Sequence, residues 1–394
     1  MAEFKKLAEP FAIGKMQMKN RIVFAPTAMA FGGPNGEVTD QNLCHYVARA
    51  QGGVGFIVVE HTLVSYKFNK GPLGIQDNSC RRGWWEISHA IHHYGVKAVV
   101  QLGLGHGAQT GTTLRPDVVM VSASDVPMCM PRGNACAGFK EWEGSPWETP
   151  RPLTIEEIKE LEDASVTAAL RVKQAGFDGV EIHAAHGYLL SSFLSPYSNK
   201  RTDQYGGSFE KRLTLAKNII RKTRQALGED LLLGLRLSLQ EHIEGGYNLK
   251  EGCRIAKSLE AEGLDYIHAS TGRFESMKYL FPKEEGAILS EAQAVKNAVS
   301  IPVICPNIHT PATGEQALRE GMADAISLSR GLIADPQWAN KALSGREDEI
   351  IACVRCNNCL KGLKEAYGAR CTVNPEVGRE RFLAQYAPPP LGAK

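Results

Sequence analysis

Two imidazoles and a phenol lie close together near the middle of the chain. His183, His186 and Tyr188 come at the end of a short apolar run, 179–183, that is typical of a buried strand. Barrel enzymes keep their chemistry at the C-terminal ends of their strands, and a phenol with a pKa of about 10 can act as a general acid at neutral pH. The alternative is structural, because a histidine at a strand end is often a core residue hydrogen-bonded to the backbone.

Four of the ten cysteines form a second motif. Cys353, Cys356 and Cys359 are spaced C-x2-C-x2-C, and Cys371 follows farther along the chain. Three thiolates at this spacing can wrap one loop around an inorganic cube, which a distant fourth thiolate closes. A zinc site more often shows two separated C-x2-C pairs, and thiols without any ligand are the remaining alternative.

Short apolar runs alternate along the chain with longer amphipathic ones. The short runs are rich in Val, Ile and Leu with little polar alternation, as expected of strands buried on both faces. The expected strands are 21–26, 55–60, 97–102, 179–183, 231–237, 265–270, 302–306 and 325–328. The expected helices are 40–51, 84–93, 154–174, 209–227, 249–261, 289–298, 313–319 and 335–343.

Eight strand–helix units predict an α/β fold, a (β/α)8 TIM barrel, rather than a doubly wound sheet. The segment 11–20, with Gly14 at its turn, is expected to be a hairpin that closes the bottom of the barrel. Thr154 and Glu157 form a capping-box signature at the start of one helix. The connection 103–151 is far longer than structureless loops usually are. We expect it to be a lid insertion over the catalytic face, with a surface excursion as the alternative.

Composition argues against several other classes of protein. The chain has 394 residues and 43% hydrophobic content, enough to bury a large core. Its net charge of +2 gives no field typical of nucleic-acid or membrane binding. No apolar stretch approaches the ~20 residues of a membrane span, and the N-terminus has no signal-peptide pattern. We therefore expect a cytoplasmic protein whose cysteines are not paired as disulfides.

The stretch around the histidine pair closely resembles the old yellow enzyme family of flavin oxidoreductases. The match continues through FLSPYSNKRTDQYGGS and extends over nearly the whole chain. The resemblance implies a bound FMN, with His183 and His186 binding the activating oxygen of the substrate and Tyr188 as proton donor. CVRCNNCL and CTVNP resemble the cluster segment of the iron–sulfur branch, which includes trimethylamine dehydrogenase, 2,4-dienoyl-CoA reductase and enoate reductases. That branch implies a 4Fe-4S cluster on Cys353, Cys356, Cys359 and Cys371.

The same resemblance predicts where FMN binds. In such barrels the loops after strands seven and eight commonly hold phosphate; here they carry Asn307, Ile308, Ser329 and Arg330. Gln101 and Arg236 correspond to the family's partners of the flavin pyrimidine and N1 side. An arginine inside a core strand needs such a partner, because an unpaired buried charge is costly. The segment beneath the isoalloxazine corresponds to Ala25, Pro26, Thr27 and Ala28.

The chain departs from the family pattern at three places. Ala28 stands where many members carry a Cys or Thr that tunes the flavin potential. Asn307 replaces the usual Arg of the seventh-strand loop, which weakens the phosphate contacts. The frequent QLxHAGR pattern is QLGLGHG in this chain, so the resemblance assigns no role to His106.

These features predict an NAD(P)H:flavin oxidoreductase, an ene-reductase. It would transfer hydride from FMN to the C=C bond of an α,β-unsaturated carbonyl compound (enone, enoate or enoyl-CoA), with the cluster relaying electrons. The alternatives are the reverse desaturation, an amine dehydrogenase-like oxidation, and an electron-transfer subunit of a larger complex. A barrel aldolase ranks last, because Lys97 lies at the wrong end of its strand.

We expect two parts, an FMN-binding barrel over 1–345 and a 4Fe-4S-binding segment with a tail over 346–394. The resembling iron–sulfur enzymes continue into FAD- and nucleotide-binding domains, whereas this sequence shows no G-x-G-x-x-G after a strand. The electrons are therefore expected from NAD(P)H at the flavin or from an electron-donor protein. We also expect that copies of the chain can form a homo-oligomer. The basic residues near the expected mouth are interpreted as surface positions, or as contacts for a CoA phosphate: Arg132, Lys140, Arg273 and Lys278.

Overall fold

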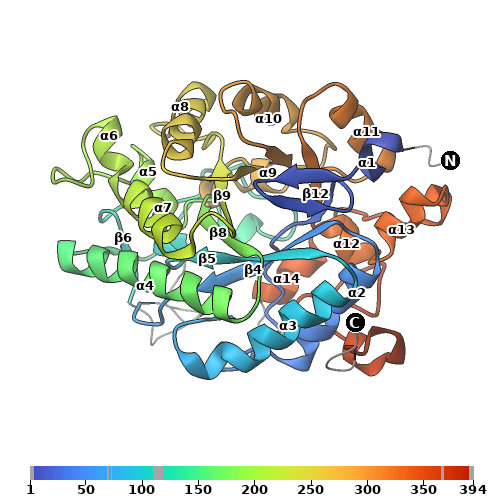
Figure 1. Cartoon of the computed structure of the whole chain (residues 1–394). Helices are drawn as coiled ribbons and strands as arrows, with labels where there is room; N and C mark the ends of the chain where they lie inside the picture. The colour runs from blue at the N-terminus through green and yellow to red at the C-terminus, as the bar shows by residue number, and fades with distance from the viewer. Residues whose placement is uncertain (1–3, 69–70, 72, 110–118, 365–367, 390–394) are drawn as a thin grey trace.

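Eight parallel strands form a closed barrel in the computed structural model, which describes residues 4–68, 71, 73–109, 119–364 and 368–389 (Figure 1). Around the barrel the strands follow the order β10-β11-β12-β3-β4-β5-β8-β9. Their bounds are β3 (Ile22–Phe24), β4 (Phe56–Leu63), β5 (Lys97–Gly103), β8 (Gly179–Ala184), β9 (Leu232–Ser238), β10 (Tyr266–Ser270), β11 (Val303–Cys305) and β12 (Ala325–Leu328). The predicted (β/α)8 barrel is confirmed, with a strand at each of the eight expected places.

Helices surround the barrel. The longer ones are α2 (Asp40–Gln51), α3 (Arg81–His93), α4 (Ile155–Gln174), α7 (Thr214–Leu227), α8 (Leu249–Glu260), α10 (Leu289–Lys296) and α11 (Pro311–Arg319). The shorter ones are α1 (Lys5–Ala8), α5 (Leu189–Leu194), α6 (Phe209–Arg212), α9 (Met277–Leu280), α12 (Arg330–Ala334), α13 (Trp338–Leu343) and α14 (Asn358–Lys364). The main core lies between the strands and these helices, and includes Ile57, Val100 and Ile182.

A β-hairpin closes the bottom of the barrel, as predicted. β1 (Phe11–Ile13) and β2 (Met16–Met18) pair antiparallel across Gly14, whose φ of +53° is readily available to glycine. Ile13 and Met18 pack with Val23 and Phe56 of the barrel strands in a second apolar cluster. Burying one such side chain stabilises the fold by about 1.5–3 kcal/mol.

Several helix boundaries differ from the prediction. α3 begins at Arg81 instead of residue 84, and α10 ends at Lys296 instead of residue 298. The expected helix 209–227 is two helices, α6 and α7, that meet at Leu213. α11 begins at Pro311, because Thr310 caps it by accepting the Thr313 N–H. α13 begins three residues late, since the Asp335 carboxylate accepts hydrogen bonds from the N–H groups of Gln337 and Ile351 instead of entering the helix. The capping box at Thr154 is confirmed.

The insertion 103–151 contains short elements and packs on the loop after β10. β6 (Val121–Ser122) pairs with β7 (Arg151–Pro152). Its apolar side chains Met128, Met130 and Phe139 form one cluster with Met277, Phe274 and Phe281. The described part of the insertion therefore contacts the C-terminal end of the barrel, where a lid would have to lie.

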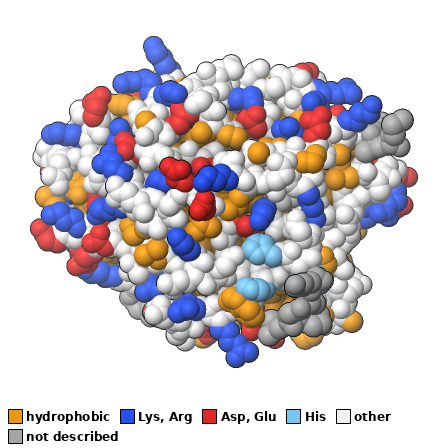
Figure 2. Space-filling model, in the orientation of Figure 1, with side chains coloured by type: hydrophobic (Ala, Val, Ile, Leu, Met, Phe, Trp, Pro, Cys, Tyr) orange, Lys and Arg blue, Asp and Glu red, His pale blue; other side chains and the backbone are white. Residues whose placement is uncertain are grey.

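The surface and the cysteines agree with the composition. Basic and acidic side chains are interspersed on the face drawn in Figure 2, without a large patch of one sign. All ten cysteines are unpaired. Within the described ranges, no helix combines the length and the apolar character that crossing a membrane requires.

Candidate active site

The histidine pair and the tyrosine meet just beyond the C-terminal end of β8. His183 lies in the strand, and its Nε2 is 3.1 Å from Nδ1 of His186. Tyr188 is the N-cap residue of α5, and its ring centroid lies 5.0 Å from that of His183. Two ring nitrogens and a phenol thus share one space, as their spacing predicts.

The turn after β8 holds His186 in an unusual backbone conformation. Its φ is +67°, which is uncommon for a residue with a Cβ and needs support from the surroundings. The His186 N–H donates to Ser238 Oγ over 2.9 Å, and its carbonyl accepts from the Phe274 N–H over 3.3 Å. The ring Nε2 lies 2.6 Å from Ser270 Oγ. The backbone and the ring are therefore both fixed.

Two further histidines complete the cluster, and the sequence interpretation missed one of them. The His61 ring centroid lies 5.1 Å from that of His183 and 5.5 Å from that of Tyr188. His106, to which the resemblance gave no role, lies 5.4 Å from both His61 and Tyr188. His61 Nε2 is buried and has no hydrogen-bond partner among the described residues. The predicted strand ended at residue 60, whereas β4 continues to Leu63, so the polar group at its end was overlooked.

Burial sets the protonation states at this site. Burial, with the nearby positive charge of Arg236, lowers the pKa of His186 well below 6.5. Burial and His186 act in the same direction on the pKa of His183. Burial raises the pKa of the Tyr188 phenol above its usual 10. At neutral pH the pair is uncharged and the phenol keeps its proton, so all three can donate hydrogen bonds.

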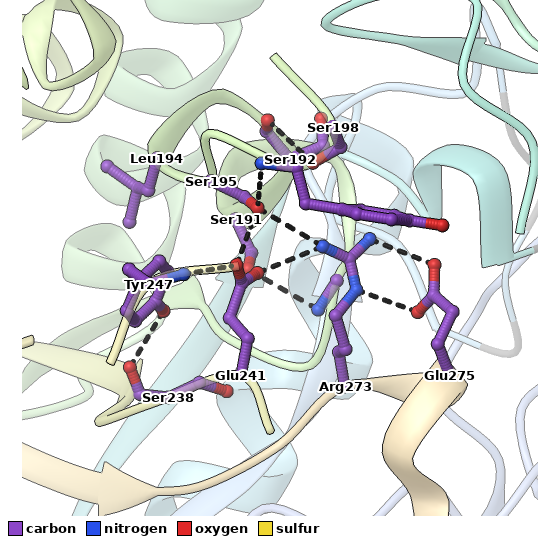
Figure 3. A network of polar contacts seen from close by, with 12 residues as sticks. Ser191, Ser192, Leu194, Ser195, Ser198, Ser238, Glu241, Tyr247, Arg273 and Glu275 are labelled. Carbon is purple, nitrogen blue, oxygen red and sulfur yellow. Dashed lines mark hydrogen bonds and ion pairs between the residues drawn. The ribbon is translucent and has the colours of Figure 1, made fainter. Parts of the chain in front are cut away.

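Arg273 is buried, not exposed at the mouth, so its sequence interpretation is wrong. Its guanidinium donates to Glu241 Oε1 over 2.9 Å and to Glu275 Oε2 over 2.7 Å (Figure 3). Two carboxylates compensate the buried charge. Gln109 Nε2 bridges Glu275 and the carbonyl of Gly187, 3.3 Å from each. This network holds the turn between His186 and Tyr188 from the outer side.

A polar network crosses the interior of the barrel below the histidines. Glu181 accepts from Gln101 Nε2 over 2.7 Å and lies 2.9 Å from His268 Nδ1. Burial alone would raise the pKa of Glu181, but His268 and Arg236 hold it below its usual value. Gly234 of β9 leaves room for the Tyr266 ring, which a Cβ there would meet at 2.0 Å.

Arg236 lies in β9 directly opposite His183 in the strand register. Only 8% of the residue is exposed, and its Nε and Nη1 have no hydrogen-bond partner within the described ranges. Burial lowers the pKa of Arg236, and Glu181 opposes the shift. An unsatisfied buried guanidinium is costly, so an oxygen atom of a bound ligand would stabilise Arg236 at these N–H groups.

The predicted flavin-contacting segments that follow β3 and β12 lie side by side. The Ala25 N–H donates to the carbonyl of Leu328, and Thr27 Oγ1 donates to Ser329 Oγ over 2.6 Å. Four backbone N–H groups in the loops after β11 and β12 donate no hydrogen bond within the described part of the chain. They belong to Asn307, Ile308, Ser329 and Arg330. The other members of the expected contact set, Pro26 and Ala28, are half-buried.

The four cysteines of the second motif line one cavity. The lining residues are Cys353, Cys356, Cys359 and Cys371 with Arg330, Ile333, Val354, Asn357, Thr372 and Val373. Arg330 donates to Asn357 Oδ1 over 2.9 Å and to the carbonyl of Pro282 over 3.2 Å. Its guanidinium therefore contacts the cysteine segment, while its backbone N–H belongs to the β12 loop. Among the described residues, no three His, Cys, Asp or Glu side chains are placed to hold a single metal ion.

Comparison with known proteins identifies the family. The sequence profile of the NADH:flavin oxidoreductase / NADH oxidase family matches residues 6–349. The chain belongs to this family. As its name states, the family couples NADH to a flavin, which agrees with the unsatisfied arginine and the free amides at the ends of the strands.

Three of the similar proteins are longer than this chain. An NADH oxidase of Thermoanaerobacter brockii is 39% identical over 100% of the chain and 59% of its own length. A cinnamate reductase of Clostridium sporogenes is 32% identical over 96% of the chain and 59% of its own length. A solved 2-naphthoyl-CoA reductase complex superposes with a TM-score of 0.85 at 29% identity, over 96% of the chain and 58% of that structure. The chain thus spans somewhat more than half the length of these relatives.

The residues present fit the flavin of this family. Arg236 supplies unpartnered N–H groups at the strand ends, and the amides after β11 and β12 supply donors for phosphate oxygens. Asn307 gives the β11 loop a left-handed turn, with φ +64°, and its side chain donates to the carbonyl of Glu284. The side-chain amide of Asn307 is thus used within the protein, so the β11 loop would hold phosphate through its backbone N–H groups.

Proposed function

We propose that the chain is an FMN-dependent reductase of the C=C bond of α,β-unsaturated carbonyl compounds. One observation carries the proposal: two neutral imidazoles and a protonated phenol converge beside an unsatisfied buried arginine. Bound FMN would supply the hydride to the β-carbon of the substrate. The chain's own residues would supply the remaining catalysis.

His183 and His186 would hold the carbonyl oxygen of the substrate. Negative charge grows on this oxygen as the β-carbon accepts the hydride, and N–H donors aimed at the oxygen stabilise that charge. His183 Nε2 and His186 Nδ1 already lie 3.1 Å apart, so one oxygen can receive a hydrogen bond from each. Because the site is buried, these hydrogen bonds are stronger than they would be in water.

Tyr188 would then donate its phenolic proton to the α-carbon. Its raised pKa keeps the proton in place until carbanion character develops at that carbon. The phenol would recover its proton from solvent after product release. His61 and Phe274, whose ring centroids each lie 5.5 Å from that of Tyr188, would keep the ring in place.

The printed names of two similar proteins support this substrate class. A cinnamate reductase and a 2-naphthoyl-CoA reductase both act on conjugated acyl compounds. A tertiary amine carries no oxygen for the histidine pair to hold, which disfavours an amine dehydrogenase-like oxidation. Enone, enoate and enoyl-CoA all satisfy the geometry.

We further propose that Cys353, Cys356, Cys359 and Cys371 bind one 4Fe-4S cluster. Support comes from their spacing and from the one cavity that they line. A zinc site more often shows two separated C-x2-C pairs, whereas this segment has the C-x2-C-x2-C spacing. The cluster would relay single electrons between the flavin and a donor.

The chain would then divide into an FMN-binding barrel over 1–345, with its lid over 103–151, and a cluster-binding segment with its tail over 346–394. The last barrel helix, α13, ends at Leu343, which supports this boundary. NAD(P)H or an electron-donor protein would supply the electrons. A homo-oligomer is compatible with both electron sources. The unpaired cysteines support a reducing, cytoplasmic compartment.

The proposal is tested on protein purified without oxygen. Denaturation should release FMN, and iron and acid-labile sulfide should each approach about four per chain. NADH and NADPH should be compared as reductants of the flavin. The reduced flavin should then be oxidised with 2-cyclohexenone or cinnamate, and trimethylamine N-oxide serves as a control acceptor that has no C=C bond. Release of FAD would contradict the FMN site, and stoichiometric zinc would contradict the cluster. Equal reoxidation by acceptors with and without a C=C bond would contradict the ene-reductase activity.

A further inference from the structure

Two serines on neighbouring strands hold His186 at different places. Ser238 at the end of β9 accepts from the His186 backbone N–H over 2.9 Å. Ser270 at the end of β10 lies 2.6 Å from the ring atom Nε2. The serines are direct partners in the β9–β10 register. One therefore fixes the backbone of His186, and the other fixes its ring.

The hydroxyl groups of the two serines donate their protons to different acceptors. Ser238 Oγ donates to the carbonyl of Gly272 over 2.7 Å, so toward His186 it acts only as an acceptor. Ser270 Oγ has no further hydrogen-bond partner in the described part of the chain, and the residue is 4% exposed. A buried O–H group without an acceptor is costly. The proton of Ser270 is therefore expected to point at His186 Nε2.

We propose that Ser270 is a positioning residue that keeps His186 in the tautomer protonated on Nδ1. A neutral imidazole carries one proton, so a nitrogen that accepts from Ser270 leaves that proton on the other nitrogen. Nδ1 is the atom that faces His183 Nε2 at 3.1 Å. Under the proposed function, on which the catalytic part of this inference rests, this is the point that receives the carbonyl oxygen.

The opposite tautomer leaves the Ser270 hydroxyl without an acceptor and removes the donor that faces His183. A proton on His186 Nε2 would make Ser270 an acceptor and leave its own O–H group unpaired. Nδ1 would then be a bare lone pair, which cannot donate to a carbonyl oxygen. His183 differs, because its Nδ1 is buried without a partner among the described residues. His186 is therefore the fixed donor of the pair, and His183 is the member that can change tautomer with its ligand.

The tautomer can be read without turnover. The full chain, loaded with FMN and labelled with 15N-histidine, would be studied by two-bond 1H–15N correlation spectroscopy, with His186 assigned by loss of its signals in His186→Asn. We expect a protonated Nδ1 and a hydrogen-bond-accepting Nε2 in the wild type. Ser270→Ala should shift His186 toward a mixture or the Nε2–H form, whereas Ser238→Ala should keep the Nδ1–H form. A wild-type proton on Nε2, or an unchanged tautomer in Ser270→Ala, would overturn the inference.

Kinetics provide the second readout. One neutral hydrogen bond corresponds to an effect of about 2- to 12-fold, so Ser270→Ala should lower kcat/KM for 2-cyclohexenone by that factor. Ser270→Thr keeps a hydroxyl and should restore both the tautomer and the rate. If the wild type reduces no enone, the proposed function is wrong, and the spectra still decide the tautomer. If the wild type reduces the enone and Ser270→Ala has the same rate and spectrum, only the inference about Ser270 is wrong.

Discussion

Replacing Tyr188 by Phe removes one oxygen atom and leaves the ring. The hydroxyl forms no hydrogen bond with the described residues, and the ring lies 5.0 Å from His183 and 5.5 Å from Phe274 between centroids. The variant should therefore keep the free energy of unfolding within about 0.5 kcal/mol of the wild type, as is usual where no buried contact is lost. Any large kinetic effect would then report the lost proton donor.

The magnitude follows from the role of a general acid. Such a group raises the rate about 10²–10⁴-fold, which corresponds to lowering the activation free energy by ~2.7–5.4 kcal/mol. The raised pKa of Tyr188 agrees with a phenol that keeps its proton until the α-carbon needs it. We expect the oxidation of reduced Tyr188→Phe by an enone to slow within this range.

The assay separates the two half-reactions by stopped-flow absorbance under anaerobic conditions. Reduction of the flavin by NADH should keep its wild-type rate, since that step needs no phenol. Oxidation by a one-electron artificial acceptor should also be unchanged. If the enone step slows less than about threefold, another donor acts, and the role assigned to Tyr188 is wrong; His61 and His106 would be tested next.

Three further predictions address the cofactors and stability. Arg236→Met should raise the Kd of FMN about 10- to 150-fold in fluorescence titrations, because a charge-assisted hydrogen bond contributes about 1.5–3 kcal/mol; an unchanged Kd would remove Arg236 from the flavin site. Cys356→Ser should lose iron and sulfide but retain FMN, and zinc in anaerobic wild-type protein would contradict the cube. Burial lowers the pKa of His61 from 6.5 to about 3, so its contribution to stability is complete above pH 6.5 and is lost as the pH falls toward 3. His61→Gln should therefore show a smaller loss of unfolding free energy between pH 7 and pH 4.5 in urea titrations than the wild type, and an equal loss would contradict this assignment.

The strands were predictable because each is an apolar run buried on both faces, and the hairpin because glycine marks its turn. Helix ends were less predictable, since they depend on competition for hydrogen bonds. Asp335 illustrates this: its carboxylate is used by Gln337 and Ile351, so α13 begins at Trp338. The sequence contains no local signal for the contact with residue 351.

The site was predictable where its residues are close in sequence and not where they come from separate strands. His183, His186 and Tyr188 lie within one turn and meet as expected. Ser270 approaches from another strand, and only the barrel register places it at His186 Nε2. Arg273 looked like a surface cation because its partner Glu241 is distant in sequence.

Product analysis of the oxidative half-reaction shows whether the chain reduces C=C bonds. Anaerobic protein whose flavin has been reduced with one equivalent of NADH is mixed with cinnamate or 2-cyclohexenone, and the products are quantified against the flavin reoxidised. We expect one saturated product per reoxidised flavin and, when the reaction is run in deuterated solvent, a deuterium label at the α-carbon. A flavin that an artificial acceptor reoxidises but that no α,β-unsaturated carbonyl compound does would contradict it.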